Sequence, residues 1–284
     1  MKTRLGAATA LAVGILVAAG GAEAKKGPIK GEDVPGVKTG SRLDVLFVID
    51  STGSMGGIID DGKREIRKVV DEILAGDPKP DLRVGLLTYR DKGDSYLQKH
   101  IPLSRDFEAF YKFMDRVMAD EGGDWPEHVS FAMHVAVSSF NWDMDKNTAR
   151  MMFLIGDAPA HTDYDDGFDF KKEAEIARDK KITINTLAMN TDPEVTEQWK
   201  LIAKVTGGSY KMIGYGGDGA APGDVDGGDY DAKDYSGDPS APKSGLGKAI
   251  TDDVKAAAEK TGTKYAKPAP KPAPKKGPAP SKPK

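Results

Sequence analysis

Four short segments of the chain are almost continuously apolar, which is typical of strands buried on both faces of a sheet. They run from Leu43 to Ile49, Val84 to Tyr89, Met151 to Ile155 and Ile182 to Met189. Between them, apolar residues recur every three or four positions, a spacing that places each set on one face of a helix. The sets are Ile59, Ile66, Val70 and Ile73; Phe107, Phe110, Met114 and Val117; and Val129, Met133 and Ala136.

This alternation of buried strands and amphipathic helices predicts an α/β fold, a doubly wound, mainly parallel sheet with helices on both faces. Only the segment from Tyr96 to Ile101 breaks the alternation. It follows a turn-rich loop at residues 91–94, so we expect one short antiparallel edge strand there. Ser209 to Ile213 is the expected last strand, and Leu246 to Lys260 an expected helix.

The N-terminal residues have the features of a secretory signal peptide. Lys2 and Arg4 precede an apolar run from Leu5 to Ala19, and residues 22–24 have the small-x-small pattern of a signal-peptidase site. The alternative is an uncleaved anchor, but the run falls short of the roughly 20 residues that span a bilayer. We therefore expect a secreted, periplasmic or envelope protein with no transmembrane segment after cleavage. The chain has no Cys, which excludes disulfides.

The C-terminal residues 264–284 contain seven Lys, seven Pro and no acidic residue. Such a composition buries little apolar surface, so we expect an extended, solvated tail. The tail is either a spacer or a contact to an anionic envelope polymer or lipid surface.

The net charge of −3 is the sum of a basic tail and an acidic remainder of the chain. Without residues 1–24 and the seven tail lysines, 32 basic and 43 acidic residues remain, which is a net charge of −11. Because nucleic-acid binding relies on basic residues, we expect no nucleic-acid partner.

Six segments follow from these patterns: a signal peptide at 1–24, a linker at 25–40, the α/β domain at 41–213, an acidic Gly/Asp-rich loop at 214–244, a helix at 245–262 and the Lys/Pro/Ala-rich tail at 263–284. The acidic loop does not match an EF-hand, because the position that needs Gly holds Asp229. Gly214 to Gly219 spells G-x-G-x-x-G, but no helix is expected after it, so we reject a dinucleotide site.

Two of the predicted strands lead directly into an aspartate, Asp50 and Asp157. In open α/β sheets, ligands bind at the carboxyl ends of the strands. Two carboxylates at one edge of a sheet repel each other and lose solvation unless a cation lies between them. A hard divalent ion satisfies both, so we expect a cation site at this edge.

The residues that follow Asp50 resemble a known family. Asp50-Ser-Thr52-Gly-Ser54 is similar to the D-x-S/T-x-S motif of von Willebrand factor A domains, which opens their metal ion-dependent adhesion site, or MIDAS. The family adds an Asp at the end of a middle strand, which Asp157 matches, and a Thr from a loop before a later helix. The resemblance implies the Rossmann-like von Willebrand A fold and Mg²⁺, or Ca²⁺ or Mn²⁺, as the cofactor.

The Thr position is where this sequence differs. Residues 122–127, Gly-Gly-Asp-Trp-Pro-Glu, resemble the G-G-D-x-P-E variant of a subset of these domains, which includes a domain attached to an alpha-type protein kinase. Asp124 stands where other members have Thr. The resemblance therefore implies a metal site made of five residues, Asp50, Thr52, Ser54, Asp124 and Asp157.

Each of these residues also has a simpler structural explanation. Thr52 and Ser54 are residue types that cap the start of a helix. Asp124 and Glu127 have the spacing of a capping pair, with Pro126 in the first helical turn. Asp157 precedes Ala-Pro and is a common turn former. Their coincidence at one sheet edge favours the metal site.

The remaining polar and aromatic residues leave alternatives open. His161 lies four residues after Asp157 and either faces the site or is structural, and structural or surface roles are favoured for His100, His128 and His134 as well. Trp125 and Tyr164 either form an apolar rim of a ligand site or cover the loops.

The sequence lacks the motifs of hydrolases and nucleotide-binding enzymes. It has no H-E-x-x-H, no nucleophile elbow around Ser54 and no phosphate-binding loop. We therefore expect a non-enzymatic, exported protein-binding module whose ion engages a carboxylate of a partner protein. The alternatives are a structural envelope protein with an internal ion and a basic tail on an anionic polymer, and, less favoured, a metal-dependent hydrolase.

Overall fold

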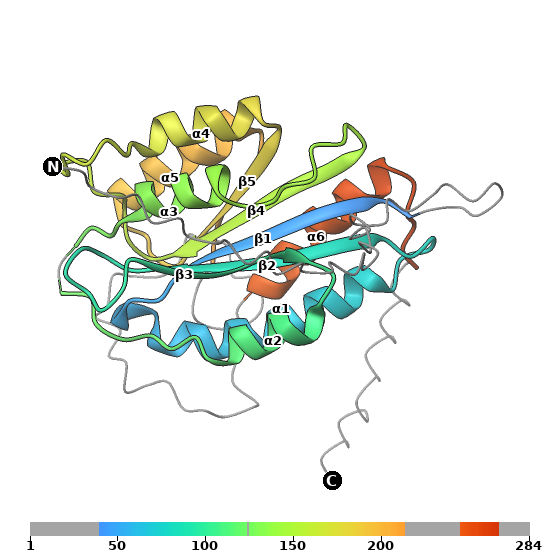
Figure 1. Cartoon of the computed structure of the whole chain (residues 1–284), viewed down its shortest axis with the longest axis horizontal. Helices are drawn as coiled ribbons and strands as arrows, with labels where there is room; N and C mark the ends of the chain where they lie inside the picture. The colour runs from blue at the N-terminus through green and yellow to red at the C-terminus, as the bar shows by residue number, and fades with distance from the viewer. Residues whose placement is uncertain (1–39, 124, 214–244, 267–284) are drawn as a thin grey trace, which may run out of the picture. The chain divides into compact units, whose positions relative to one another are not determined.

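The computed structural model describes residues 40–123, 125–213 and 245–266, and shows strands and helices alternating along the chain (Figure 1). The strands are β1 (Arg42–Asp50), β2 (Asp81–Tyr89), β3 (Gln98–Ser104), β4 (Thr148–Gly156), β5 (Ile182–Ala188) and β6 (Tyr210–Met212). The helices are α1 (Gly56–Leu74), α2 (Phe107–Asp115), α3 (Val129–Ser138), α4 (Phe170–Asp179), α5 (Pro193–Thr206) and α6 (Leu246–Lys260), and a short 3₁₀ turn, η1 (Gly53–Met55), precedes α1.

The strands form one sheet in the order β3-β2-β1-β4-β5-β6. All neighbours are parallel except β3, which runs antiparallel to β2 at the edge of the sheet. This arrangement confirms the predicted α/β fold with a mainly parallel sheet and one antiparallel edge strand. Because β1 lies between β2 and β4, its carboxyl end is next to the carboxyl ends of both.

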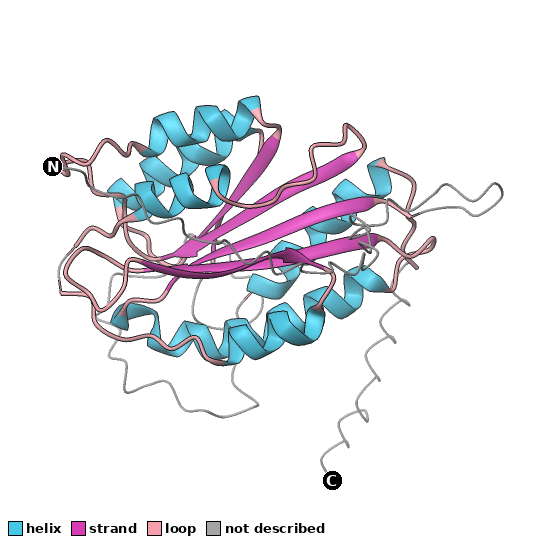
Figure 2. Ribbon diagram, in the orientation of Figure 1, coloured by secondary structure: helices cyan, strands magenta, loops and turns pink. Residues whose placement is uncertain are grey.

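Helices cover both faces of the sheet, as Figure 2 shows. The side chains of Val45 and Phe47 pack with α1, α2 and α6, whereas those of Leu46 and Val48 pack with α3, α4 and α5. Successive side chains of a strand point to opposite faces, so a strand covered on both sides needs apolar residues at every position. This is the physical origin of the continuous apolar runs in the sequence.

The helices α4 and α5 are absent from the periodic apolar sets of the sequence. Both carry clear N-terminal caps. Asp169 accepts hydrogen bonds from the backbone N–H of Lys171 and Lys172 at the start of α4, and Asp192 accepts them from the first backbone N–H groups of α5. Pro193 occupies the first position of α5, and Gly207 ends it with a positive φ of 72°. These start and stop residues are the signals that identify the two helices.

The helix α6 spans the predicted residues and belongs to the same core as α1. Just beyond it, Thr263 Oγ1 accepts a hydrogen bond from the backbone N–H of Ser41 (3.0 Å), and Ser41 Oγ donates to the carbonyl of Ala258 (2.6 Å). The two ends of the described domain therefore meet at the start of β1. No helix within the described ranges is long and apolar enough to cross a membrane.

Several predicted segments fall on residues that the structure does not describe. The signal peptide, almost all of the linker, the acidic loop up to residue 244 and the tail from residue 267 lie outside the described residues, as does Asp124.

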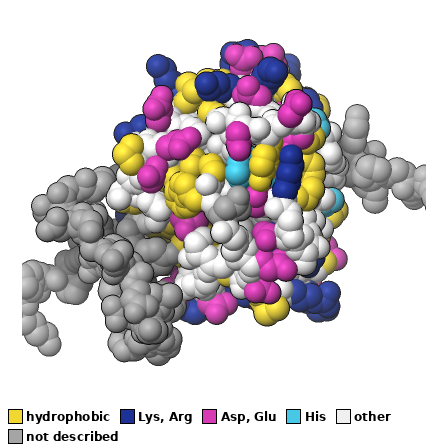
Figure 3. All heavy atoms as spheres, turned by 90° about the vertical axis from the view of Figure 1, so that its left-hand side faces the viewer, with side chains coloured by type: hydrophobic (Ala, Val, Ile, Leu, Met, Phe, Trp, Pro, Cys, Tyr) yellow, Lys and Arg dark blue, Asp and Glu magenta, His cyan; other side chains and the backbone are white. Residues whose placement is uncertain are grey.

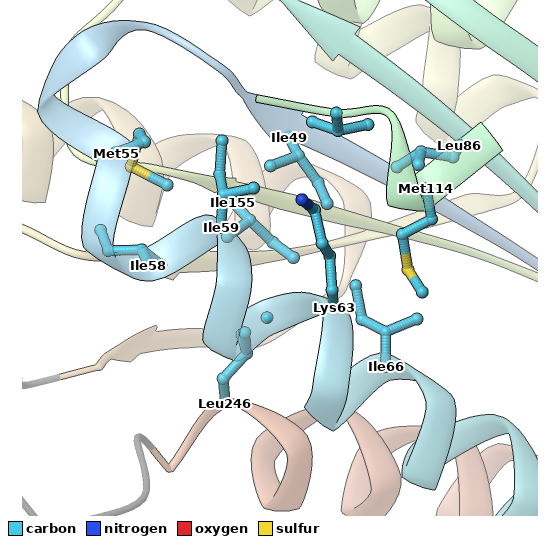
Figure 4. A pocket seen from close by; sticks show the side chains of 12 residues that line it. Ile49, Met55, Ile58, Ile59, Lys63, Ile66, Leu86, Met114, Ile155 and Leu246 are labelled. Carbon is cyan, nitrogen blue, oxygen red and sulfur yellow. The ribbon is translucent and has the colours of Figure 1, made fainter. Parts of the chain in front are cut away.

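Met55 anchors the segment that follows β1. Its side chain is fully buried and lines a small apolar cavity between α1 and the sheet, together with Ile49 and Ile155 from the strands and Leu246 from the start of α6 (Figure 4). Because Met55 follows Ser54 directly, this anchor holds the end of the Asp50–Ser54 segment against the sheet.

Candidate metal centre

The predicted metal residues lie at the carboxyl ends of two neighbouring strands. Asp50 is the last residue of β1, and Asp157 directly follows β4, its parallel neighbour. Between Asp50 and α1 the chain turns through η1, which carries Ser54. The five residues before Asp50, Val45 to Ile49, are apolar on both faces of the sheet, so the chain becomes polar again where the strand leaves the core.

Hydrogen bonds join four of the five predicted residues. Asp50 Oδ1 accepts from the backbone N–H of Thr52 (2.9 Å) and from its hydroxyl (2.7 Å). The Thr52 and Ser54 hydroxyl oxygens are 3.3 Å apart, and the Ser54 hydroxyl donates to Asp157 Oδ1 (3.1 Å). The fold therefore gathers two carboxylates and two hydroxyls, from segments 103 residues apart, into one cluster.

The simpler explanation of Thr52 and Ser54 as helix caps is wrong. Thr52 stands at the N-cap position of η1 and Met55 at that of α1, but neither position has a side-chain capping hydrogen bond. The Thr52 hydroxyl is a donor to Asp50 and so is turned toward the carboxylate cluster.

Asp124 lies outside the described residues, but the helix that follows it is described. The N-cap of α3 is His128, and the helix begins at Val129. Pro126 is therefore not in the first helical turn, and the capping pattern of Asp124 with Glu127 is wrong in its placement. The reason is that Glu127 pairs with Ala160 in an isolated parallel bridge, so this segment is extended where the pattern predicts helix.

The two carboxyl groups of the cluster are in an unfavourable environment when they are charged. Asp50 is completely buried; this burial and, second, the nearby charge of Asp157 raise its pKa to about 7. Burial is also the main cause of the raised pKa of Asp157. Buried carboxylates with raised pKa values mark sites where a positive charge is favourable.

The donor atoms fit a hard divalent cation. Asp50 Oδ2 is buried and has no hydrogen-bond partner among the described residues, so one strong oxygen donor is left unused by the protein. Ser54 is exposed and Asp157 is 9% exposed, so the cluster opens to solvent on that side. Within the described ranges, no group of three or more Asp, Glu or His side chains is arranged to hold a metal, so the hydroxyl oxygens are needed to complete a coordination set.

Glu127, which the local sequence pattern places in a helix cap, is a buried acid. It is 4% exposed, its Oε2 atom has no hydrogen-bond partner in the described structure, and burial followed by the charges of Asp50 and Asp91 raises its pKa to about 9. Its carboxyl group interacts with Thr52, so it adjoins the cluster. The signal available in the sequence was its place in the Gly-Gly-Asp-Trp-Pro-Glu segment, three residues after Asp124.

Tyr89 is a second buried polar residue beside the cluster. It ends β2, is fully buried, and its hydroxyl has no partner among the described residues. A side chain at Gly156 would come within 2.9 Å of both this hydroxyl and Asp50 Cβ. The last residue of β4 must therefore be Gly if Asp50 is to occupy its position.

The histidines have structural partners. The His161 ring stacks on Tyr164 at 3.8 Å, and its Nδ1 atom lies 2.8 Å from Asp163 Oδ1. His128 contacts Asp166, His134 contacts Glu173, and His100 contacts Gln98. These contacts agree with the structural and surface roles that the sequence favoured.

The end of the molecule that carries the cluster combines acidic and hydrophobic side chains (Figure 3). Trp125 is 45% exposed, whereas Tyr164 is half-buried and donates its hydroxyl to Asp91 (2.5 Å). Of the two aromatic residues, Trp125 is the more exposed, and Tyr164 joins two loops through its hydrogen bond to Asp91.

Comparison with known proteins gives matches at the family level. A model of the von Willebrand factor A domain family matches residues 44–212, more than half of the chain. The alpha-protein kinase vwkA of Dictyostelium discoideum is 30% identical over 130 residues, which cover 45% of this chain and 20% of that protein. The chain thus spans about a fifth of the length of this relative.

Solved structures with similar chains have low sequence identity. The VWA domain of SpRpn10 aligns with a TM-score of 0.47 and 12% identity, covering 61% of this chain and 88% of that one. Proximal thread matrix protein 1 from the mussel byssus, in a structure with a zinc-occupied MIDAS motif, aligns with a TM-score of 0.49 and 14% identity, covering 61% and 42%.

Proposed function

The chain belongs to the von Willebrand factor A domain family, and we propose that it is a binding module that engages a carboxylate of a partner protein through a divalent cation. Domains of this family generally act as protein-interaction modules. In the proposed site, Asp50, Thr52, Ser54 and Asp157 hold the cation, and Asp124 is the fifth residue.

The buried carboxyl group of Asp50 is the observation that carries this proposal. Its Oδ1 atom is held by two hydrogen bonds from Thr52, so the carboxylate is fixed in orientation, while Oδ2 lacks a partner in the described structure. A buried acceptor without a partner costs about 1–3 kcal/mol, more when it is charged. A bound cation removes this cost.

The carboxylates and the hydroxyls have different roles in the proposed cation site. Asp50 and Asp157 neutralise the charge of the cation, and the Thr52 and Ser54 hydroxyls supply neutral oxygens between them. The exposure of Ser54 leaves one side of the cluster open to another molecule. When bound, the cation supplies a positive charge and an open coordination position for an acidic group.

Oxygen donors favour Mg²⁺, Ca²⁺ or Mn²⁺ over softer metals. Two carboxylates match a charge of +2, and the third carboxylate of Asp124 makes the local sum −1. We expect this extra charge to strengthen cation binding and to make the cation less attractive to an acidic ligand.

We propose no catalytic activity. The Ser54 hydroxyl interacts with Asp157 and Thr52, so it is not paired with an imidazole as an activated nucleophile would be. The kinase activity named for the Dictyostelium relative belongs to a protein of which this chain spans about a fifth.

Affinity capture from the envelope of the exporting organism tests this function. The wild-type protein, an Asp157→Asn variant and a chain lacking residues 267–284 are each used as bait, with and without EDTA. We expect partners that are lost with EDTA and with Asp157→Asn but kept without the tail. Partners lost only on removal of the tail contradict this function and favour the structural envelope protein, and metal-dependent substrate turnover favours the hydrolase.

A further inference from the structure

Arg90 directly follows β2 and is 4% exposed. Three acceptors of its guanidinium group lie on two separate segments. Nε donates to the carbonyl of Ser51 (3.1 Å), Nη1 to the carboxylate of Glu121, and Nη2 to the carbonyl of Met118 (3.3 Å). Arg90 therefore joins the Asp50–Ser54 segment to residues 118–121.

Residues 120 and 121 themselves hold the Asp50–Ser54 segment through the backbone. The N–H of Asp120 donates to the carbonyl of Ser51 (3.2 Å), and the N–H of Gly53 donates to the carbonyl of Glu121 (2.9 Å). A Cβ atom at Gly53 would lie 2.7 Å from that carbonyl oxygen. The two backbones are thus in close contact on both sides of Thr52.

The conformation of Glu121 needs support from its side chain. Its φ of 61° lies in the left-handed region, which is unfavourable for a residue other than glycine. Its carboxylate accepts hydrogen bonds from Arg90 and from the backbone N–H and hydroxyl of Ser95, the latter two at 2.8 Å. Arg90 and Ser95 therefore hold Glu121 in the conformation in which its carbonyl meets Gly53.

We propose that Arg90 is a positioning residue of the metal centre, which fixes the Ser51 carbonyl and residues 118–121 so that Asp50, Thr52 and Ser54 direct their oxygens to one cation. This inference rests on the proposed function. The positive charge of Arg90 opposes a cation nearby, so its contribution is geometric. A lysine has one ammonium group and cannot bridge three acceptors in the same plane.

Two substitutions of Arg90 distinguish its role in positioning the ligand residues from the effect of its charge on Mg²⁺ affinity. Arg90→Lys keeps the charge but loses the three-way contact, and we expect Mg²⁺ affinity to fall about 10-fold to 100-fold, the usual effect of removing a residue that orients metal ligands. Arg90→Gln removes a positive charge next to an acidic site. Charge alone predicts tighter Mg²⁺ binding for this variant, whereas loss of positioning predicts weaker binding.

Glu121 provides a matched pair of variants on the exposed side of the same contact. Glu121→Gln keeps an oxygen that accepts from Arg90 and Ser95, and Glu121→Ala does not. Both remove one negative charge, so charge alone predicts equal Mg²⁺ affinities. Positioning predicts that Glu121→Gln binds more tightly than Glu121→Ala. Arg105→Gln, which breaks an ion pair with Asp81 at the start of β2, is the control for loss of an arginine elsewhere.

Mg²⁺ affinities are measured by calorimetric titration, and metal-free melting curves in EDTA identify variants that do not fold. Wild-type affinity in Arg90→Lys, tighter binding in Arg90→Gln, or equal affinities in the two Glu121 variants overturns the inference. If Asp50→Asn abolishes binding and the Arg90 variants do not weaken it, the metal site stands and only the role of Arg90 is wrong. If the wild type binds no divalent ion, the proposed function fails as well.

Discussion

At the scale of single residues, the protonation of Asp50 links the proposed metal centre to the stability of the fold. Its pKa in the folded domain is about 7, mainly because of burial and then because of Asp157, against an ordinary value of 3.8. A carboxyl group with a raised pKa stabilises the folded state in its protonated form. This contribution is fully present below about pH 4 and is lost as the pH rises through 7.

We therefore predict that the metal-free domain loses stability between about pH 4 and about pH 7. A shift of this size corresponds to roughly 4 kcal/mol when the contribution is lost completely. Melting curves in EDTA across this range measure the loss, and the Asp50→Asn variant should show a smaller dependence. Adding Mg²⁺ at pH 8 should raise the melting temperature of the wild type. If the melting temperature of the metal-free domain instead rises from about pH 4 to about pH 7, the prediction that ionisation of the buried Asp50 destabilises the fold is wrong.

By its resemblance to the family motif, the sequence places Asp124 where other members have Thr. We predict that Asp124→Thr weakens Mg²⁺ affinity, because it removes a third carboxylate near the cation, and preserves or improves the capture of a carboxylate-bearing partner. Calorimetric titration of wild type and variant measures the first effect. Equal affinities would mean that Asp124 does not contribute to the cation's environment, and the proposed site would shrink to four residues.

At the scale of elements, the end of β4 sets the space available to Asp50. We predict that Gly156→Ala destabilises the domain by about 1–3 kcal/mol, since the new methyl group meets Asp50 Cβ and the Tyr89 hydroxyl at 2.9 Å. It should also reduce Mg²⁺ affinity by displacing Asp50. Gly245→Ala is the control, because no atom lies within 4 Å of the added Cβ. Urea unfolding with and without Mg²⁺ measures both effects, and identical curves for Gly156→Ala and wild type would refute this packing.

The elements show which physical signals a sequence carries. The buried strands were predictable because a strand covered on both faces needs a nearly continuous apolar run, as in Val45 to Ile49. Helix α5 was not predicted from periodicity, although Asp192 and Pro193 mark its start. The turn that precedes α3 was misassigned because Asp124, Pro126 and Glu127 satisfy a local capping pattern. The long-range bridge of Glu127 to Ala160 overrides that pattern, and no local rule predicts it.

The candidate site was also only partly predictable, because local sequence signals reveal some of its residues and long-range contacts place the others. The pairing of Asp50 with Asp157 followed from the rule that parallel strands end at one edge of a sheet. No sequence rule predicts that Glu127, Tyr89 and Arg90 lie beside this cluster. The place of each depends on burial or on contacts between segments far apart in the chain.

At the scale of the whole molecule, the proposed metal centre and the ends of the domain lie at opposite ends of β1. Ser41 and Thr263 meet before the first residue of this strand, and Asp50 is its last residue. Nine residues of strand span about 30 Å. A partner engaged at Asp50, as proposed, would therefore contact the end of the domain opposite to Ser41 and Thr263, which are both buried.

Export is a prediction about the whole chain that the fold does not test. Lys2, Arg4, the apolar run from Leu5 to Ala19 and the small residues at 22 and 24 predict cleavage after Ala24. Intact-mass measurement of the exported protein should give a chain that begins at Lys25. A mass that includes residues 1–24 would refute this prediction.

The central claim is that one divalent cation binds at the carboxyl ends of β1 and β4. Calorimetric titration of Mg²⁺, and in parallel of Ca²⁺ and Mn²⁺, into the EDTA-treated and dialysed protein at pH 7.5 tests it most directly, with Asp50→Asn as the matched variant. We predict binding of one ion per chain at this site, release of protons because the carboxyl groups with raised pKa values must ionise, and loss of this binding in Asp50→Asn. The claim is contradicted if the wild type binds none of the three ions or if Asp50→Asn binds them as tightly as the wild type.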